Sequence, residues 1–365
     1  MRALAVALIG LAGCSTAGSS SPDPNAAAES AGSAGTPPSL DFQFEVIAEL
    51  DRPPGNIAVG PDGTVYVTLH QFFGPEYPVA TVSDGATKRA LEDVELDSPL
   101  GIAVDEAGTV WALDNGLASG TPPRLVARGN NGVTREYDLS SATLKGSFVN
   151  DLVIDLAKRA AYIADPASGS DAALIVLDLA SGKARRLLEG HESVIPDPNL
   201  DLVIDGVPVT MKQGDSYLKP KIGVNPIATD ADKEWLYFGA MHGTQMYRIK
   251  TSALRDPSLG AVELRNQIAR FGAKPICDGI AVDSDGNLYL GDLANNAIGV
   301  IRSDGSYQEL VRDPRLSWVD AFAVGPNQMI YAVTNQLQRS PILNQGTSTA
   351  QPPFFVVKFS PIGVR

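Results

Sequence analysis

A short pattern of alternating apolar residues recurs along the chain and predicts its main structural unit. In the segment 278–292, two short runs of alternating apolar residues flank the pair Asp285-Gly286. Alternation of this kind has the period of a β-strand. Asp-Gly is typical of a tight turn, because glycine adopts positive φ angles at little cost. The segment therefore predicts a β-hairpin, with the polar residue Asp278 at its leading end.

Six segments share this pattern, which consists of a polar or small residue, an alternating apolar run, a turn, and a second run with an aromatic residue. They are 55–67, 100–112, 150–165, 225–238, 278–292 and 320–332. Their starts lie about 40 to 75 residues apart, which is the scale of a propeller blade. Further apolar runs lie between the hairpins, such as Ala173–Asp178 and Gln245–Ile249, so each repeat has about four strands.

Six such repeats, packed radially, predict an all-β protein with one domain, a six-bladed β-propeller over residues 42–365. The ring closes if the last strand, Phe354–Phe359, pairs with the early strand Phe44–Ala48. The widest gap between repeats contains a long insertion at 196–217, and one helical turn is expected at 252–254.

The composition agrees with many turns and argues against one class of partner. The 365 residues include 35 glycines and 26 prolines, which suits a chain of short strands. The formal net charge is -13, and the sequence contains no basic stripe. A protein that binds nucleic acid through its phosphates needs such a stripe. We therefore expect no nucleic-acid partner.

The first residues resemble a bacterial lipoprotein signal. Arg2 precedes a short apolar run, 3–11, which is too short to span a bilayer. The run leads into Leu11-Ala12-Gly13-Cys14, which resembles a lipobox. The resemblance implies a signal peptide over residues 1–13, cleavage before Cys14 and lipidation of its thiol. An ordinary cleaved signal with a free Cys14 is the alternative.

These features predict an exported lipoprotein that is held at the outer membrane or cell surface through a lipid anchor at Cys14. Ser15, rather than an aspartate, follows the cysteine, which favours the outer membrane. Residues 14–41 are rich in Ser, Ala, Gly and Pro and predict a flexible tether. With Cys14 acylated, only Cys277 remains, so we expect no intramolecular disulfide and interpret Cys277 as a buried packing residue.

The leading residues of the six repeats carry the main functional hypothesis. In a propeller the innermost strand of each blade runs along the central channel, so residues at the same place in these strands form a ring. Aligned on their apolar runs, the repeats place six residues in it: Gly55, Leu100, Asn150, Asn225, Asp278 and Asp320. Four of the six are carboxylates or carboxamides. Asp151, which follows Asn150, faces either the channel or the blade interior.

Three interpretations of this ring stay open. The polar residues cap strands and satisfy backbone groups at the channel mouth, or they bind a small ligand that is cationic, or they hold a metal. Asn150, Asn225 and Asp278 offer an all-oxygen set that suits a hard divalent cation such as Ca²⁺. Trp318, two residues before Asp320, is a candidate ligand wall, since an aromatic face beside carboxylates suits an amine.

Other chemistry has little support in the sequence. The three histidines, His70, His191 and His242, have no zinc-like spacing to one another or to a cysteine. No Gly-x-Ser-x-Gly elbow and no phosphate-binding glycine-rich loop occurs. His70 follows the first hairpin and is a candidate base at the rim. Asp165 and Asp292 end second strands, and we expect them at the opposite rim or in turns.

Several motifs, taken in order, resemble the major royal jelly protein/Yellow family. They are Phe148–Asp155, Ala161–Asp165, Ala173–Asp178, Arg185–Pro196, Leu236–Phe238, Asp320–Val324 and Thr334–Leu337. The similarity runs from about residue 42 to the C-terminus. It implies a secreted six-bladed propeller that binds small molecules such as biogenic amines. Insect Yellow members are linked to dopachrome conversion, and no catalytic residue set is carried over from them.

The chain is also distantly similar to the gluconolactonase/luciferin-regenerating propellers. In those proteins a Glu, two Asn-type positions and an Asp at strand starts hold a divalent metal. Asn150 with Asp151, Asn225 and Asp278 are similar to the last three. The Glu, whose place is near Gly55, is missing and departs from the pattern. If this resemblance extends to activity, Asp278 is the candidate catalytic base.

These observations lead to one expectation and two alternatives. We expect a surface-anchored propeller that binds a small molecule at the channel mouth through Asn150, Asp151, Asn225, Asp278, Asp320 and Trp318. One alternative is an enzyme that uses the same ring, either a metal-dependent lactonase or related hydrolase, or a dopachrome-converting isomerase. The other is an interaction scaffold with an inert channel. A divalent cation such as calcium is the cofactor that the metal interpretation requires.

Overall fold

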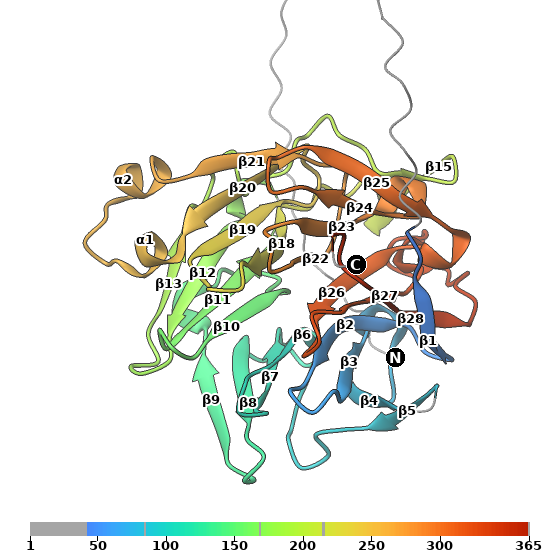
Figure 1. Ribbon diagram of the computed structural model, residues 1–365, viewed down its shortest axis with the longest axis horizontal. Helices are drawn as coiled ribbons and strands as arrows, with labels where there is room; N and C mark the ends of the chain where they lie inside the picture. Colours follow the sequence, from blue (N-terminus) through green and yellow to red (C-terminus); the bar gives the residue numbers. More distant parts are fainter. Residues whose placement is uncertain (1–41, 84, 168, 214–215, 364–365) are drawn as a thin grey trace, which may run out of the picture.

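Six four-stranded antiparallel sheets surround a central axis in the computed structural model (Figure 1). The structure describes residues 42–83, 85–167, 169–213 and 216–363. The predicted signal peptide, the predicted lipidation site Cys14 and the predicted tether lie outside these residues. The prediction of an all-β, six-bladed propeller is confirmed.

The blades follow one another along the chain, and in each blade the first-named strand is innermost and the last-named strand is outermost. Blade 1 contains β2 (Pro54–Val59), β3 (Val65–Leu69), β4 (Val79–Ser83) and β5 (Ala86–Arg89). Blade 2 contains β6 (Pro99–Val104), β7 (Val110–Asp114), β8 (Arg124–Arg128) and β9 (Thr134–Asp138). Blade 3 contains β10 (Leu152–Asp155), β11 (Ala160–Asp165), β12 (Ala173–Asp178) and β13 (Ala184–Leu187).

The other three blades have the same arrangement. Blade 4 contains β18 (Val224–Thr229), β19 (Trp235–Ala240), β20 (Gln245–Lys250) and β21 (Ala269–Ala273). Blade 5 contains β22 (Ile280–Val282), β23 (Leu288–Asp292), β24 (Ala297–Ile301) and β25 (Tyr307–Arg312). Blade 6 contains β26 (Val319–Val324), β27 (Ile330–Thr334), β28 (Phe354–Phe359) and, outermost, β1 (Glu45–Leu50).

The apolar core lies in layers between successive blades. The innermost strands β2, β6, β10, β18, β22 and β26 each contact the next around the ring. The middle strands are apolar on both faces because each blade packs between two others, and in β11 and β12 every residue except Asp178 is buried. One layer joins Tyr162 and Leu174 of blade 3 to Phe238 of blade 4. Cys277 is fully buried in another layer, as its interpretation as a packing residue requires.

The N-terminal strand closes the ring, as predicted. β1 pairs antiparallel with β28, with Glu45 opposite Lys358 and Leu50 opposite Phe354. Figure 1 shows the two strands side by side at the outer edge of blade 6. Blade 6 is thus built from segments that lie about three hundred residues apart in the chain, and its outer layer depends on both of them.

The insertion between blades 3 and 4 folds over one mouth of the channel. It contains two short hairpins, β14 (Val203–Ile204) with β15 (Val207–Pro208), and β16 (Met211–Gln213) with β17 (Ser216–Leu218). Residues of the insertion share one apolar cluster with residues of blades 4, 5 and 6: Leu202, Ile204, Val209, Met211, Met241, Leu293, Trp318 and Leu337. The insertion therefore covers the end of the channel where the inner strands begin.

Two short helices, α1 (Thr251–Arg255) and α2 (Ala261–Arg265), lie in the connection between β20 and β21. α1 includes the helical turn that the sequence predicted at 252–254. None of the helices in the described ranges is both long and apolar enough to cross a bilayer.

Candidate functional site

Local breaks in strand register lie near the start of the inner strands of blades 1, 2, 4 and 6. In blade 2, Leu100 is an extra residue between two residues paired with β7, and in blade 6 Asp320 is an extra residue relative to β27. Asn225 of blade 4 and Asn56 of blade 1 lie in similar breaks. Such β-bulges re-aim side chains and are common beside functional sites. Two polar residues of the predicted ring, Asn225 and Asp320, thus lie in bulges, whereas Asn150 and Asp278 precede the regular strands β10 and β22.

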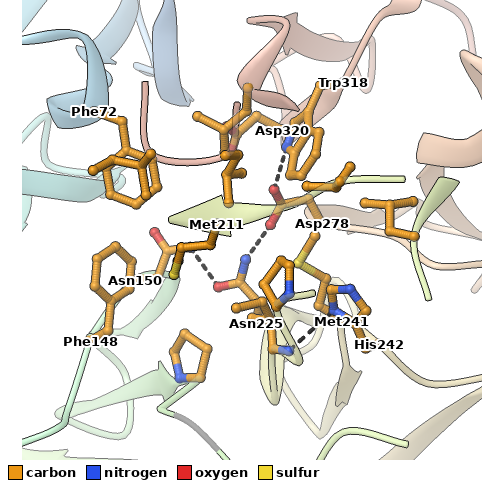
Figure 2. A pocket seen from close by; sticks show the side chains of 18 of the residues that line it. Phe72, Phe148, Asn150, Met211, Asn225, Met241, His242, Asp278, Trp318 and Asp320 are labelled. Carbon is orange, nitrogen blue, oxygen red and sulfur yellow. Dashed lines mark hydrogen bonds between the residues drawn. The ribbon is translucent and has the colours of Figure 1, made fainter. Parts of the chain in front are cut away.

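A row of hydrogen bonds joins four of the predicted site residues (Figure 2). Asn150 donates from Nδ2 to Oδ1 of Asn225 at 2.5 Å. Asn225 in turn donates from Nδ2 to Oδ1 of Asp278. The indole of Trp318 donates to the other oxygen of Asp278, Oδ2, at 2.7 Å. All four side chains are buried, so two donors from different blades hold the carboxylate of Asp278 in one orientation.

Asp151 and Asp320 each have a carboxamide partner that the alignment of repeats did not select. Asn56 donates from Nδ2 to Oδ1 of Asp151 at 2.6 Å. Asn335, which follows β27, donates from Nδ2 to Oδ2 of Asp320 and to the backbone oxygen of Pro54. These bonds connect blade 1 to blades 3 and 6, so the polar network runs across the channel mouth between segments far apart in the sequence.

Burial and mutual repulsion favour the protonated forms of the three channel-mouth carboxylates, which are Asp151, Asp278 and Asp320. Burial raises the pKa of Asp278 to about 7, although hydrogen bonds from Trp318 and Asn225 oppose the rise. Burial also raises the pKa of Asp151 well above its ordinary value, and the charge of Asp278 adds to this. The pKa of Asp320 is well above its ordinary value for the same two reasons. Because the three carboxylates interact, each protonation step is a property of the three groups together and not of one residue.

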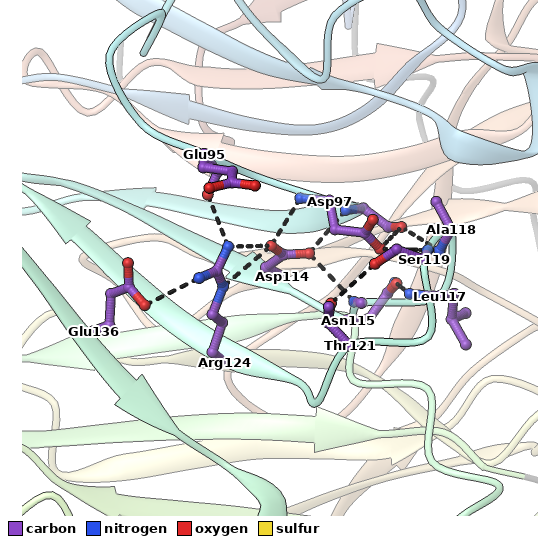
Figure 3. A network of polar contacts seen from close by, with 12 residues as sticks. Glu95, Asp97, Asp114, Asn115, Leu117, Ala118, Ser119, Thr121, Arg124 and Glu136 are labelled. Carbon is purple, nitrogen blue, oxygen red and sulfur yellow. Dashed lines mark hydrogen bonds and ion pairs between the residues drawn. The ribbon is translucent and has the colours of Figure 1, made fainter.

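Other buried aspartates of the propeller are neutralised by arginine. Asp114 ends β7, and Arg124 of β8 lies 3.4 Å from its Oδ2 within the network of Figure 3. Asp165 ends β11 and pairs with Arg186 at 2.5 Å. Within the described ranges, no Lys or Arg pairs with any of the three channel-mouth carboxylates. The channel mouth therefore carries acidic groups that the described part of the chain does not neutralise.

The polar row forms part of the lining of a cavity of about 90 Å³ (Figure 2). Its walls are mostly apolar and include Phe72, Phe148 and Met241 from the blades and Met211 from the insertion. Apolar walls with a few convergent polar groups are the usual form of a small-molecule pocket. Trp318 also lines the cavity and has a φ of 57°, which is rare for a bulky residue and marks a strained backbone at this site.

Two histidines, His70 and His242, line the same cavity. Of these two, the sequence indicated a site role for His70 alone. His70 follows β3, and His242 follows β19 by two residues. Burial lowers the pKa of each imidazole to about 3. Both rings are therefore neutral near pH 7, and a group with so low a pKa is a poor general base there. The geometry gives His70 a place at the cavity but argues against the role of base.

The expectation that Asp165 and Asp292 lie at the opposite rim or in turns is wrong. β23 pairs antiparallel with β22, so the end of β23 lies at the same face as the start of β22. Asp165 accepts a hydrogen bond from the backbone nitrogen of Phe148, which lines the cavity. The residues that end or follow second strands thus form a further set at the channel mouth, and His70, His242 and Asn335 belong to it.

The structure brings six predicted site residues to one mouth of the channel: Asn150, Asp151, Asn225, Asp278, Trp318 and Asp320. Leu100 lines the cavity as an apolar residue. Gly55 lacks a side chain, and its neighbour Asn56 supplies the polar group of blade 1. The residues predicted from the sequence did not include Asn56, Asn335 or His242. The sequence contains a weak signal for Asn56, which is a polar residue next to a glycine at the start of a strand. It contains no such signal for Asn335 or His242.

A metal at this mouth would depend on carboxamide oxygens. No three acidic, histidine or cysteine side chains among the described residues come close enough to hold a metal by themselves. Asn225 and Asp278 each place one oxygen in the hydrogen-bonded row, which Asn150 joins through Nδ2, and these three side chains carry the oxygens that a hard cation prefers. Asn56 stands beside the position of the missing Glu, and its Oδ1 accepts from the backbone nitrogen of Ile57 at 2.7 Å. The donor set thus has three members of the expected four.

Six blades around a channel mouth with oxygen donors and apolar walls define the class of protein, a six-bladed β-propeller with a candidate site on its axis. The family model described as major royal jelly protein matches residues 97–349. The chain belongs to the major royal jelly protein family, which confirms the resemblance seen in its motifs. No curated protein matches the chain significantly.

Solved structures with a similar fold include several proteins of low sequence identity. A gluconolactonase from Xanthomonas campestris has a TM-score of 0.56 and 14% identity, over 88% of this chain and 90% of that one. A luciferin-regenerating enzyme has a TM-score of 0.54 and 14% identity, over 89% and 97%. Regucalcin from Agrobacterium tumefaciens, a calcium-binding protein, has a TM-score of 0.53 and 14% identity, over 87% and 93%. At such identity the likeness shows the fold alone.

Proposed function

We propose that the protein binds a small cationic molecule, such as an organic amine, at the channel mouth. The supporting observation is the set of three buried carboxylates without a basic partner among the described residues. A buried carboxylate is costly unless it is paired or protonated. A cationic ligand would pair with Asp278 and Asp320, which both line the cavity, and would favour their ionised forms.

The walls of the cavity suit the apolar part of such a ligand. Phe72 and Phe148 lie on one side of the polar row and present aromatic rings (Figure 2). Aromatic faces attract organic cations and also bury their carbon atoms. The enclosed volume of about 90 Å³ limits the part of a ligand that fits beneath the insertion to a small group.

The test compares the binding of amines with the binding of neutral analogues to a protein that contains all described residues. Propylamine and tyramine carry a positive charge, whereas propanol and 4-propylphenol have nearly the same shape without it. We expect calorimetry to show binding of the amines, with neutral analogues weaker by about tenfold or more. Equal affinity of charged and neutral partners would contradict the proposal.

A matched pair of variants separates the site from a general effect of charge. Asp278→Asn removes a cavity carboxylate, while Asp285→Asn removes an exposed carboxylate from the turn of the same hairpin. We expect the first variant to lose the preference for amines and the second to keep it. If the two variants behave alike, the preference comes from the net charge of -13 and not from the channel mouth.

A metal-dependent hydrolase is the second candidate, and the row of Asn150, Asn225 and Asp278 favours it. These three residues would hold a divalent cation, and a bound cation of this kind supplies Lewis-acid polarisation of a carbonyl oxygen. Asp278 would also be the group that accepts a proton from water. Lactone hydrolysis that Ca²⁺, Zn²⁺ or Mn²⁺ stimulates and Asp278→Asn abolishes would support this candidate over the binding protein.

The scaffold alternative predicts a channel that binds no small molecule. A thermal-shift assay without response to any amine, lactone or metal would favour it.

We also propose that Cys14 anchors the exported protein to the outer membrane or cell surface through a lipid. The proposal rests on the lipobox-like motif that precedes this residue. Metabolic labelling with a fatty acid should label the wild-type chain and leave Cys14→Ala unlabelled. Equal labelling of the two proteins would contradict the anchor without affecting the proposal for the channel mouth.

A further inference from the structure

His242 has an unusual position at the cavity wall, because its ring is fixed on one side and unpartnered on the other. The backbone nitrogen of His242 donates to the carbonyl oxygen of Ile222 at 3.1 Å. The backbone nitrogen of Ile222 returns a hydrogen bond to Nδ1 of the imidazole at 3.2 Å. The side chain is 1% exposed. These contacts hold the ring in one orientation against the segment that leads into β18.

The bond from Ile222 determines which nitrogen of His242 carries the proton. Nδ1 accepts a hydrogen bond, so in the neutral ring the proton is on Nε2. The ring is neutral near pH 7, because burial, with a contribution from Lys221, lowers its pKa to about 3. Nε2 is therefore an uncharged N–H donor.

This donor has no partner within the described ranges. Buried side-chain nitrogen and oxygen atoms of eight residues lack a hydrogen bond there, and His242 is the one residue among them that lines the cavity. A buried N–H group without an acceptor is unfavourable, and native proteins rarely retain one. A donor that the fold fixes and leaves unpartnered, in a residue that lines a cavity, is a candidate to receive an acceptor from a ligand.

The cavity that His242 lines also contains two of the acidic groups of the site, Asp278 and Asp320. In the view of Figure 2, His242 and Asp278 lie on one side of the cavity, and Phe72 and Phe148 lie on the other. An anion in this cavity would meet the like charge of Asp278 and Asp320. An anion is therefore disfavoured as the acceptor, although the charges of Lys221 and Lys274 act on His242 itself. A neutral oxygen, such as that of a carbonyl group, fits both the uncharged donor and the acidic surroundings.

We propose that His242 is a ligand-binding residue that donates from Nε2 to an uncharged carbonyl oxygen of the molecule whose cationic group meets Asp278. This inference rests on the proposed binding function and deepens it, because it restricts the ligand to small cations that also contain a carbonyl oxygen, such as amino amides and amino ketones. A simple alkylamine would satisfy the carboxylate and leave His242 unpartnered.

Two ligands and two variants test the inference. N-(2-aminoethyl)acetamide and pentylamine have a chain of the same length and the same cationic end, but only the first has a carbonyl oxygen. His242→Asn keeps an oxygen that can accept from Ile222 and removes the distal donor. His242→Gln keeps a distal N–H group. The affinity of each ligand for each protein is measured by calorimetry, after thermal unfolding has shown that both variants are folded.

We expect the wild-type protein to bind the acetamide more tightly than pentylamine by about tenfold, as for one buried hydrogen bond. His242→Asn should abolish this ratio through loss of acetamide affinity while pentylamine affinity stays unchanged, and His242→Gln should recover part of it. A ratio that His242→Asn leaves unchanged, with Asp278→Asn still abolishing amine binding, would overturn the role of His242 alone. Absence of binding by every amine would overturn the proposed function together with this inference.

A measurement without any substitution guards against a variant that fails to fold. Long-range ¹H–¹⁵N spectra of histidine-labelled wild-type protein report the state of each imidazole nitrogen. Addition of the acetamide should shift the Nε2 and Hε2 signals of His242, and addition of pentylamine should shift them much less. Equal shifts with both ligands, or none with either at saturation, would contradict the hydrogen bond.

Discussion

Asn56 of blade 1 donates a hydrogen bond to Asp151 of blade 3 at 2.6 Å, although 95 residues separate them in the chain. Blade 2 lies between these blades and contributes the apolar residue Leu100 to the cavity. The carboxamide of Asn56 is thus the polar partner of a buried carboxylate that has no basic neighbour among the described residues. The pair links the start of the propeller to its middle across the channel mouth.

Replacing this carboxamide by a carboxylate should destabilise the protein in a pH-dependent manner. In Asn56→Asp, two carboxylates face each other, so the folded protein retains a proton on the pair. The pKa of Asp151 is already raised in the folded protein, so the unfolded chain releases this proton above about pH 4 and the folded protein does so only at higher pH. Stability should therefore fall as pH rises, and urea unfolding at pH 5 and pH 8 should show a larger loss at pH 8.

Asn131→Asp is the control for this substitution. Asn131 is exposed in the turn between β8 and β9, and its Oδ1 accepts from the backbone of Val133, which an aspartate can also do. We expect this variant to show nearly the same stability as the wild type at both pH values. An equal loss at pH 5 and pH 8 for Asn56→Asp would mean that residue 56 does not face Asp151.

The bulge at Asn56 also explains why sequence reasoning selected the wrong residue in blade 1. An alignment of repeats assumes that residues at the same distance from the apolar run point their side chains in the same direction. In a strand, a shift of one residue turns the side chain to the opposite face. The extra residue in β2 breaks this assumption, so Asn56 rather than Gly55 supplies the polar group. In blades 4 and 6 the alignment selected bulge residues correctly, because Asn225 and Asp320 happened to be polar there.

The architecture was predictable because a propeller repeats one local unit. Each hairpin has its own alternation and turn, and six copies leave few ways to bury their apolar faces. The position of the insertion was not predictable, since its contacts with Trp318 and Leu337 join distant segments and carry no periodic signal. The same holds for His242, whose importance comes from the hydrogen bond with Ile222 and from the open nitrogen opposite it.

Close packing of neighbouring inner strands predicts that Gly279 cannot carry a side chain. A Cβ there would lie 2.4 Å from the carbonyl oxygen of Asp320 and 2.6 Å from Cα of Ala321. These are backbone atoms, so relief of the clash requires the inner strands of blades 5 and 6 to separate. We expect Gly279→Ala to lower the free energy of unfolding by about 1–3 kcal/mol in chemical denaturation.

Gly146→Ala is the matched control, because a Cβ at Gly146 meets no atom within 4 Å. This variant should be neutral or slightly stabilising, since alanine reduces the freedom of the unfolded chain. Gly279→Ala should also weaken amine binding, because it displaces Asp320 from the cavity. Equal stability of the two variants would contradict the close approach of the two strands.

Closure of the ring by β1 predicts that the first strand is needed for stability. A chain that begins at residue 51 lacks β1, so β28 keeps β27 but loses its outer partner, and the cluster around Leu50 and Phe354 becomes exposed. Compared with a chain that begins at residue 42, we expect its melting temperature to fall by roughly 10 °C or more. A synthetic peptide of residues 42–51, added in excess, should restore part of the difference. Identical melting of the two chains would show that closure contributes little.

Amine binding should depend on pH through the ionisation of Asp278. The carboxylate pairs with a cation only when it is ionised, and its pKa is about 7. Affinity for propylamine, which stays protonated in this range, should therefore rise between about pH 6 and pH 8 and become constant above that. This rise in affinity reports the ionisation of the three carboxylates together, because Asp320 and Asp151 interact with Asp278. An affinity that does not change over this range would exclude Asp278 as the partner of the amine.

The indole of Trp318 should set the midpoint of this dependence. Its Nε1 donates to Oδ2 of Asp278 at 2.7 Å, and a hydrogen bond to the ionised form lowers the pKa of the acid. Trp318→Phe removes that donor, so ionisation becomes harder and the midpoint should move upward by about one pH unit, the equivalent of one charge-assisted hydrogen bond. Calorimetric titrations of propylamine from pH 5 to pH 9 measure the shift.

Trp111 offers a matched control for the loss of an indole donor. Its Nε1 donates to Oδ2 of Asp105 at 2.8 Å, and neither residue lines the cavity. Trp111→Phe should therefore leave the midpoint of amine binding in place, even if it lowers stability. A shift of the midpoint in both variants would point to a general change of the fold. If the midpoint shifts in neither variant, the hydrogen bond from Trp318 does not control the ionisation of Asp278, although the strained backbone at Trp318 holds the indole beside this carboxylate.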